Sequence, residues 1–305
     1  MSEQSVIFHI GYHKTGTTWM QERLFVPAFG YAPLMTHRQV WDMIVAPHAL
    51  AFDPAPAAMA IASARAAAPS GLAPVVSSEI LCGMPFTGSR ESTEFARRIK
   101  AIAPDARILI TIRAQIPMIV ATYMQYVRRG GTRSPSRFFT HDPSPGYDQF
   151  DAGTFRYDRL VEYYQSLFGA DRVRVMTQEM LVAEPARFMR DLAAWAGAEA
   201  PPDLPDTGRV GISDPEAAQA LLRFANHFRF DDATDWPVID TGRLGTYAFR
   251  TVSALYRHQP LRRLAGRSRP VTTKVHQLYR GAFAQSNRRL LELCAPWLEL
   301  PGYET

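Results

Sequence analysis

Ile10-Gly11-Tyr12-His13-Lys14-Thr15-Gly16-Thr17-Thr18-Trp19 is the stretch of this sequence that says most about its fold. It follows the apolar run 6–10 and precedes a segment of helical character, 19–25, which together predict a strand, a short loop and a helix. Gly11 and Gly16 allow tight turns that bring backbone N–H groups close to a ligand. The helix directs its free N–H groups and the positive end of its dipole to the same place. The loop is therefore predicted to bind a phosphate or a sulfate group.

Side chains in the loop support an anion site. Lys14 adds a full positive charge, and Thr15, Thr17 and Thr18 add hydroxyl donors. Only three of the 34 basic residues are lysines, so arginine is the usual cation of this chain. A compact ammonium group fits into a narrow loop where a planar guanidinium does not. We therefore expect Lys14 to have a role in the site.

The composition is that of an ordinary globular protein. The 305 residues are 47% hydrophobic and 21% charged, enough for a sizeable core. The net charge of +5 suits an anionic ligand, but the basic residues are dispersed, so no nucleic-acid partner is predicted. Cys82 and Cys294 are too few for a disulfide framework and lack metal-ligand spacing, so no metal is expected. No signal peptide and no apolar run of roughly 18 residues is evident, which predicts a cytoplasmic protein without a transmembrane segment.

Strands and helices are predicted to alternate over most of the chain. Strands are expected at 6–10, 74–79, 107–113 and, near an edge, 172–176. Helices are expected at 19–25, 55–68, 89–103, 117–127, 154–168 and 185–195, with irregular segments at 26–53 and 132–150. This order predicts an α/β fold of the three-layer, P-loop-like type, in which helices flank a central parallel sheet.

The C-terminal third is predicted to be helical and to pack on the core within one domain, 1–305. The core covers about 5–200 and the helical part 201–305. Its expected parts are a linker at 200–212, a capping box Ser213-Asp214-Pro215-Glu216 that opens a helix to about 228, an irregular segment 229–270, and one long helix 272–293.

Polar side chains follow three of the predicted strands. They are Lys14 with its threonines, Ser77-Ser78-Glu79, and Arg113. Since the carboxyl ends of parallel strands lie at one edge of a sheet, these groups are expected to converge there.

The loop differs from the phosphate loop of nucleotide hydrolases, Gly-x-x-x-x-Gly-Lys-Ser/Thr. Here the lysine precedes the second glycine, and no apolar strand ends in an obvious magnesium-binding aspartate. Metal-dependent phosphoryl transfer is therefore disfavoured.

The segment 13–21, His13-Lys14-Thr15-Gly16-Thr17-Thr18-Trp19-Met20-Gln21, resembles the 5′-phosphosulfate loop of sulfotransferases that use 3′-phosphoadenylyl sulfate (PAPS). The stretch from Ile112 to Gly131 is similar to the 3′-phosphate segment of bacterial members. Ser77-Ser78-Glu79 and Ser286-Asn287-Arg288-Arg289-Leu290 resemble this family too. The resemblance implies metal-free, in-line transfer of a sulfuryl group from PAPS to a hydroxyl or amine.

The resemblance also implies roles for individual residues. Lys14 would stabilise charge on the bridging oxygen of the leaving group. Glu79 would be the general base, and Arg113 would offer a fork to the 3′-phosphate. The donor-binding residues implied are Lys14, Thr15, Gly16, Thr17, Thr18, Arg113 and Thr122.

The sequence departs from the family at one position. A serine is usual eight residues after the arginine, where this chain has Ala121. Thr122 is adjacent and is predicted to supply the missing hydroxyl. Arg267-Ser268-Arg269 is predicted to contribute from a C-terminal loop.

Alternatives remain open at this point. Glu79 and Arg113 could instead be structural ion-pair partners, and the protein could be a P-loop kinase of small alcohols or a catalytically silent nucleotide-binding protein. The acceptor is expected to be a small molecule or a glycan, and a carbohydrate or glycolipid is favoured. A glycolipid would bring the protein into peripheral contact with a membrane. The irregular segments carry aromatic residues expected to line its cleft, namely Trp41, Phe138, Phe139, Tyr147, Trp236 and Tyr247.

Overall fold

We describe the protein from a computed structural model. The described residues are 4–140, 149–199, 214–233, 238–239, 241–258, 263 and 266–305. They contain a five-stranded sheet in the order β2-β3-β1-β4-β5, in which every neighbouring pair is parallel. The strands are β1 (Ile7–His9), β2 (Tyr31–Met35), β3 (Ala73–Ser77), β4 (Arg107–Ile112) and β5 (Val173–Thr177). The predicted α/β class with a central parallel sheet is confirmed.

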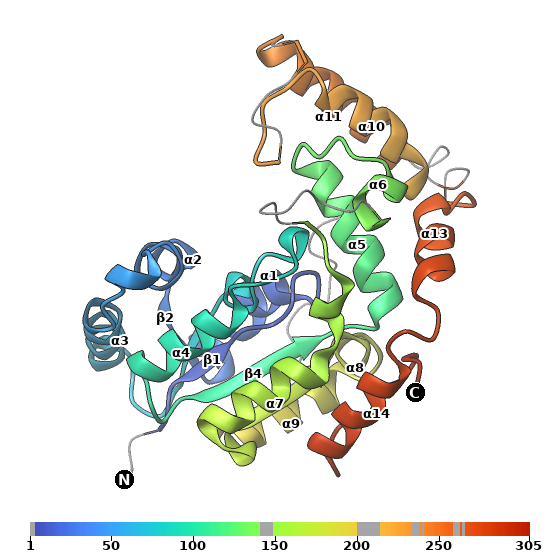
Figure 1. Cartoon of the computed structure of the whole chain (residues 1–305). Helices are drawn as coiled ribbons and strands as arrows, with labels where there is room; N and C mark the ends of the chain where they lie inside the picture. Colours follow the sequence, from blue (N-terminus) through green and yellow to red (C-terminus); the bar gives the residue numbers. More distant parts are fainter. Residues whose placement is uncertain are drawn as a thin grey trace.

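Helices cover both faces of the sheet (Figure 1). The longer ones are α3 (Ala55–Ala67), α4 (Ser92–Ile102), α5 (Gln115–Arg128), α7 (Tyr157–Phe168), α9 (Pro185–Ala196), α10 (Gln219–Asn226), α11 (Arg243–Arg257), α13 (Pro270–Tyr279) and α14 (Ala284–Leu293). The shorter ones are α1 (Thr17–Trp19), which continues as a π-turn (Met20–Leu24), α2 (His37–Val40), α6 (Pro135–Thr140) and α8 (Gln178–Ala183).

Alternate side chains of each strand bury against different helices. In β1, Ile7 belongs to a cluster with Leu24 and Phe188, from the turn after α1 and from α9. Phe8 belongs to the opposite cluster, which contains residues of α4, α5 and α7. Because β1 and β4 lie inside the sheet, both of their faces are covered, and their sequences are almost continuously apolar. This gives three layers, helix, sheet and helix.

The structure corrects several predicted boundaries. The segment 26–53 was expected to be irregular, but it contains β2, an edge strand paired with β3. The segments 132–150 and 229–270 contain α6 and α11. The expected helix 272–293 is two helices, since the chain turns at Gly281, whose φ is +74°.

The expected capping box is only partly observed. Ser213, like the linker 200–212, lies outside the described residues. Glu216 does not bond back to its own helix start; its carboxylate accepts from the backbone N and the Oγ1 of Thr272, at 2.8 and 2.6 Å. It thereby joins the start of α10 to the first turn of α13.

The C-terminal helices pack on the α/β core. Helices α10 and α13 contact α5, and α14 contacts α7. Residues as distant as Phe8, Leu290 and Tyr303 belong to one buried cluster. The α10–α11 hairpin extends away from the sheet (Figure 1). No helix in the described part of the chain is long and apolar enough to cross a bilayer.

Candidate functional site

A buried polar platform lies beneath the loop that follows β1. His9, at the end of β1, forms hydrogen bonds to Ser77 Oγ of β3 (2.8 Å) and Thr111 Oγ1 of β4 (3.0 Å). Burial lowers the pKa of His9 to about 3, so the imidazole is neutral. A neutral ring can donate from one nitrogen and accept at the other, which ties the three central strands together.

The loop itself lies close against β4. A Cβ on Gly11 would lie 1.9 Å from Thr111 Oγ1 and 2.6 Å from His9 Nε2, so only glycine fits. The next backbone N–H, of Tyr12, donates to Thr111 O at 2.9 Å. Thr15 Oγ1 donates to Tyr12 O (2.6 Å) and lies 2.8 Å from Thr111 Oγ1. The Thr15 hydroxyl therefore shapes the loop, and its backbone N–H is the group left for a ligand.

The tip of the loop has a conformation suited to enclosing an anion. Lys14 and Gly16 have φ values of +67° and +91°, in the left-handed region that is rare for lysine. Thr17 is buried and Thr18 is exposed at the start of α1. Burial lowers the pKa of Lys14, and the positive charges of Arg128, Arg129 and Arg113 act in the same direction. The loop thus lies in a surplus of positive charge.

Glu79 lies close enough to the loop for its charge to act on the pKa values of Lys14 and His13. It begins a short turn of 3₁₀ helix (Glu79–Cys82) after β3, and its Oε2 is buried without a hydrogen-bond partner among the described residues. His13 Nε2 is buried and unpartnered too. Burial lowers the pKa of His13, while the charge of Glu79 acts against this shift. A buried carboxylate oxygen with no partner is costly unless a ligand or solvent group satisfies it.

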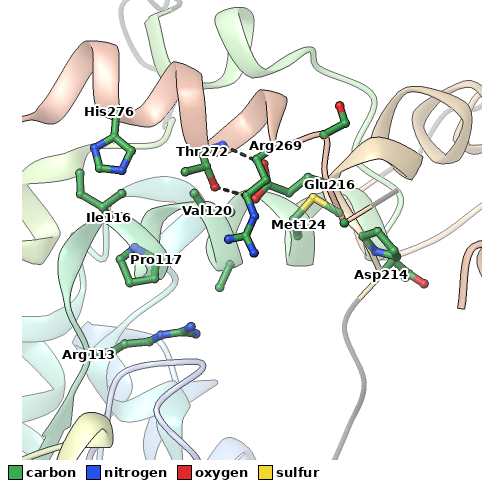
Figure 2. A pocket seen from close by; sticks show the side chains of 14 residues that line it. Arg113, Ile116, Pro117, Val120, Met124, Asp214, Glu216, Arg269, Thr272 and His276 are labelled. Atoms are coloured by element: carbon green, nitrogen blue, oxygen red, sulfur yellow. Dashed lines mark hydrogen bonds between the residues drawn. The ribbon is translucent and has the colours of Figure 1, made fainter. Parts of the chain in front are cut away.

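A second region of the site is a pocket of about 480 Å³ between α5 and the segment that leads into α13. Arg113, Ala121, Ser268 and Arg269 line it, and both guanidinium groups point into it (Figure 2). The pocket therefore brings together two arginines that are 156 positions apart in the sequence, Arg113 and Arg269.

The charges of this pocket favour an anion. Its two carboxylates are occupied: Asp214 pairs with Arg257 at 2.7 Å, and Glu216 accepts from Thr272. By contrast, neither Arg113 nor Arg269 forms an ion pair with any described residue. The structural alternative for Arg113, an ion pair, is thus not observed within the described chain.

Thr122 lies in a different environment from the one predicted. Helix α5 keeps its register, so Ala121 faces the pocket while the Thr122 side chain is buried. The Thr122 hydroxyl donates to Met118 O at 3.0 Å, one turn earlier in the helix. Its oxygen is therefore not available to a ligand in this pocket, and we leave it out of the proposed site.

Sequence reasoning missed part of the surroundings of Arg113. Glu179, which follows β5, accepts from Ala114 N (3.0 Å) and from Tyr303 OH (3.1 Å). It fixes the start of α5 and thereby the backbone of Arg113. The Tyr157 hydroxyl adds a bond to Arg113 O at 2.7 Å. Nothing in local spacing predicts these contacts, because the partners come from remote segments.

Comparison with known proteins identifies the family. A family model described as "Sulfotransferase family" matches residues 6–202, well over half of the chain. The chain belongs to the sulfotransferase family. A search of curated proteins gives no match.

Three solved structures are similar to this sulfotransferase-family chain, and the first of them supports its fold. A sulfotransferase from Alicyclobacillus acidocaldarius is 20% identical to this chain, with a TM-score of 0.50. The aligned region covers 69% of this chain and 87% of that sulfotransferase. The sulfotransferase domain of the curacin biosynthetic pathway is 10% identical (TM-score 0.38; 91% and 98% covered). A mouse sulfotransferase complexed with PAP is 12% identical (TM-score 0.33; 90% and 89% covered).

Proposed function

We propose that this protein transfers a sulfuryl group from PAPS to a hydroxyl or amine of an acceptor. The observation that carries the proposal is the convergence of three groups at the carboxyl edge of the sheet. These are the loop with Lys14, the unpartnered Glu79 carboxylate, and the arginine pocket of Arg113 and Arg269. Each corresponds to one chemical need of the reaction: a leaving-group stabiliser, a base and a donor anchor.

The donor would be held at both of its charged ends. The backbone N–H groups of Thr15, Gly16 and the first residues of α1, with the Thr17 and Thr18 hydroxyls, would hold the 5′-phosphosulfate. Arg113 and Arg269 would take the 3′-phosphate by charge-assisted hydrogen bonds. The two arginines are unpaired among the described residues, so they are free for this role.

The chemical step needs a proton acceptor and a stabilised leaving group. The acceptor oxygen or nitrogen would form a bond to sulfur as the bond from sulfur to the bridging oxygen of the 5′-phosphate breaks. Glu79 would take the proton of the acceptor, and the Lys14 ammonium would lie at the oxygen where charge develops. Neither residue is engaged in an ion pair with a described residue.

The acceptor class is the least specified part of the proposal. A carbohydrate or glycolipid is favoured by exposed aromatic side chains such as Trp41 and Tyr247. Phe138 and Phe139, which were expected to line the acceptor cleft, are instead buried in an aromatic cluster with Phe150. Tyr147 and Trp236 lie outside the described residues.

Ligand-induced stabilisation tests the proposal. Adenosine 3′,5′-bisphosphate at 100 times its Kd should raise the Tm by about 4 °C, since it adds about 2.7 kcal/mol to the folded state of a chain of this length. AMP, which lacks the 3′-phosphate, should raise the Tm less when it is added at the same concentration as the bisphosphate. Equal stabilisation by AMP would contradict the assigned 3′-phosphate pocket.

Turnover assays distinguish the proposed sulfotransferase from two alternatives, a P-loop kinase of small alcohols and a catalytically silent nucleotide-binding protein. Transfer from PAPS that survives a chelator excludes a magnesium-dependent kinase, and loss of this transfer in Glu79→Gln excludes a silent binding protein. Glu91→Gln is a matched control, because among the described residues its carboxylate accepts a hydrogen bond from the backbone N of Met84, at 2.7 Å. A Glu79→Gln variant as active as the wild type would refute the role of the base.

A further inference from the structure

A smaller pocket of about 210 Å³ lies between the start of α4 and the start of α7. We call it the α4–α7 pocket; its polar lining includes Ser89, Ser92, Thr93, Arg156, Arg159 and Tyr163. Each of the two helices precedes a strand of the parallel sheet, α4 before β4 and α7 before β5. Their N-termini therefore lie at the carboxyl edge of the sheet, the edge that also carries the donor loop.

Neither helix N-terminus at this pocket has a side-chain cap, although the backbone N–H groups of Ser92 and Arg159 donate to Ser89 O and Arg156 O. Neither the start of α4 at Ser92 nor the start of α7 at Tyr157 receives a hydrogen bond from a capping side chain. These helices have 11 and 12 residues, so their dipoles and remaining first-turn N–H groups add positive potential. The first turns also carry Glu94 and Asp158, which offset part of it; Glu94 pairs with Arg98 at 2.9 Å, and Asp158 accepts from Ser286 Oγ. Two such ends facing one pocket favour an anion there.

Two arginines add to this positive potential. Arg156 directly precedes α7 and Arg159 lies in its first turn, where the helix dipole disfavours cations. Neither guanidinium forms an ion pair or a hydrogen bond within the described part of the chain. The only carboxylate among the lining residues is Asp151, and its Oδ1 accepts from Gly153 N at 2.7 Å. The pocket thus holds two unpaired cations against one occupied anion.

A buried hydroxyl also lacks a partner at this pocket. Ser89 is only 6% exposed, and its Oγ has no hydrogen-bond partner among the described residues. Its backbone has a φ of +50°, an uncommon conformation for serine. An unsatisfied buried hydroxyl is costly, and an oxygen of a bound anion would remove that cost.

We propose that the α4–α7 pocket is a second oxyanion site, which binds a phosphate, sulfate or carboxylate group independently of the donor loop. Tyr12 and Cys82 also line it; Tyr12 lies two residues before Lys14, and Cys82 Sγ donates to Glu79 O at 3.0 Å. The pocket therefore adjoins the two segments that carry the proposed catalytic residues. The anion could be an acidic group of the acceptor, a possibility that rests on the proposed function. It could instead be a free inorganic anion.

Calorimetric titration with inorganic phosphate tests the site, with and without saturating adenosine 3′,5′-bisphosphate to occupy the donor loop. The double variant Arg156→Gln/Arg159→Gln should bind phosphate at least 10-fold more weakly than the wild type in the presence of the bisphosphate, and Ser89→Ala should also weaken binding. Arg288→Gln is the matched control: Arg288 is exposed and lines a neighbouring groove of about 450 Å³ that the same two arginines border.

Two results would overturn the site. One is unchanged phosphate affinity in the double variant. The other is a loss in Arg288→Gln with none in Ser89→Ala, which would place the anion in the neighbouring groove. Bisphosphate affinity should be equal in the wild type and the double variant. A wild type that binds no bisphosphate would refute the proposed function while leaving the phosphate result in force.

Steady-state kinetics of the wild type and the double variant, with one acidic acceptor and a matched neutral one, identify the source of the anion. If the acceptor supplies the anion, the double variant should raise KM at least 10-fold for the acidic acceptor and leave KM for the neutral one unchanged. Loss of phosphate binding without any change in either KM supports the site and assigns it to a free anion.

Discussion

The buried His9 predicts a specific loss of stability in acid. Its folded-state pKa of about 3 lies far below the ordinary value of 6.5, because burial disfavours the imidazolium ion. Below pH 6.5 the unfolded chain takes up a proton that the folded chain cannot hold, so stability falls as the pH falls. This linkage amounts to about 2 kcal/mol between pH 7 and pH 5 from His9 alone.

Urea unfolding of the wild type and His9→Asn at pH 7, 6 and 5 checks this value. The variant loses the bonds to Ser77 and Thr111 and should be less stable at pH 7. Its unfolding free energy should nevertheless fall by about 2 kcal/mol less than that of the wild type on acidification. Every other titratable group is the same in both proteins, so its contribution cancels in the comparison. Parallel pH profiles would refute a neutral His9 at the base of the loop.

Three further outcomes follow from the site geometry. Gly11→Ala should lower the free energy of unfolding by about 2 kcal/mol or more, because its Cβ would overlap Thr111 Oγ1. Gly71→Ala, with open space around it, should show only the smaller cost of its φ of +88° in the same urea experiment. Lys14→Met should lower kcat for transfer from PAPS about 100-fold or more in single-turnover assays. Arg113→Gln and Arg269→Gln should each weaken adenosine 3′,5′-bisphosphate about 10-fold or more by calorimetry and leave AMP binding unchanged.

The central strands and the loop that follows β1 could be predicted because their signals are local. Within β4, the residues 108–112 are buried and apolar apart from Thr111, as expected of a strand that is covered on both faces. The glycine spacing after β1 predicted the loop. Strand β2 was missed because Pro33 interrupts its apolar pattern. An edge strand tolerates proline, since its outer N–H groups have no partner strand.

The second half of the site depends on contacts that no local pattern contains. The pocket joins Arg113 to Arg269 only after α13 has packed on α5, an arrangement fixed by remote contacts such as Glu216 with Thr272. Whether Ala121 or Thr122 faces the pocket depends on the direction in which each residue of α5 points. Adjacent helical residues point about 100° apart, so neighbouring positions face different surroundings, and Thr122 falls on the buried side.

The charges around Lys14 suggest how binding of the proposed donor would affect the protonation of this lysine. Burial and the charges of Arg128, Arg129 and Arg113 lower the pKa of Lys14. A bound phosphosulfate and 3′-phosphate would add negative charge beside these cations, which raises the pKa of Lys14 again. Binding of such a donor would therefore favour the ammonium form of Lys14, the form that can stabilise charge on the bridging oxygen. Since a donor of this kind would bind the folded chain and not the unfolded one, its binding should also raise the free energy of unfolding.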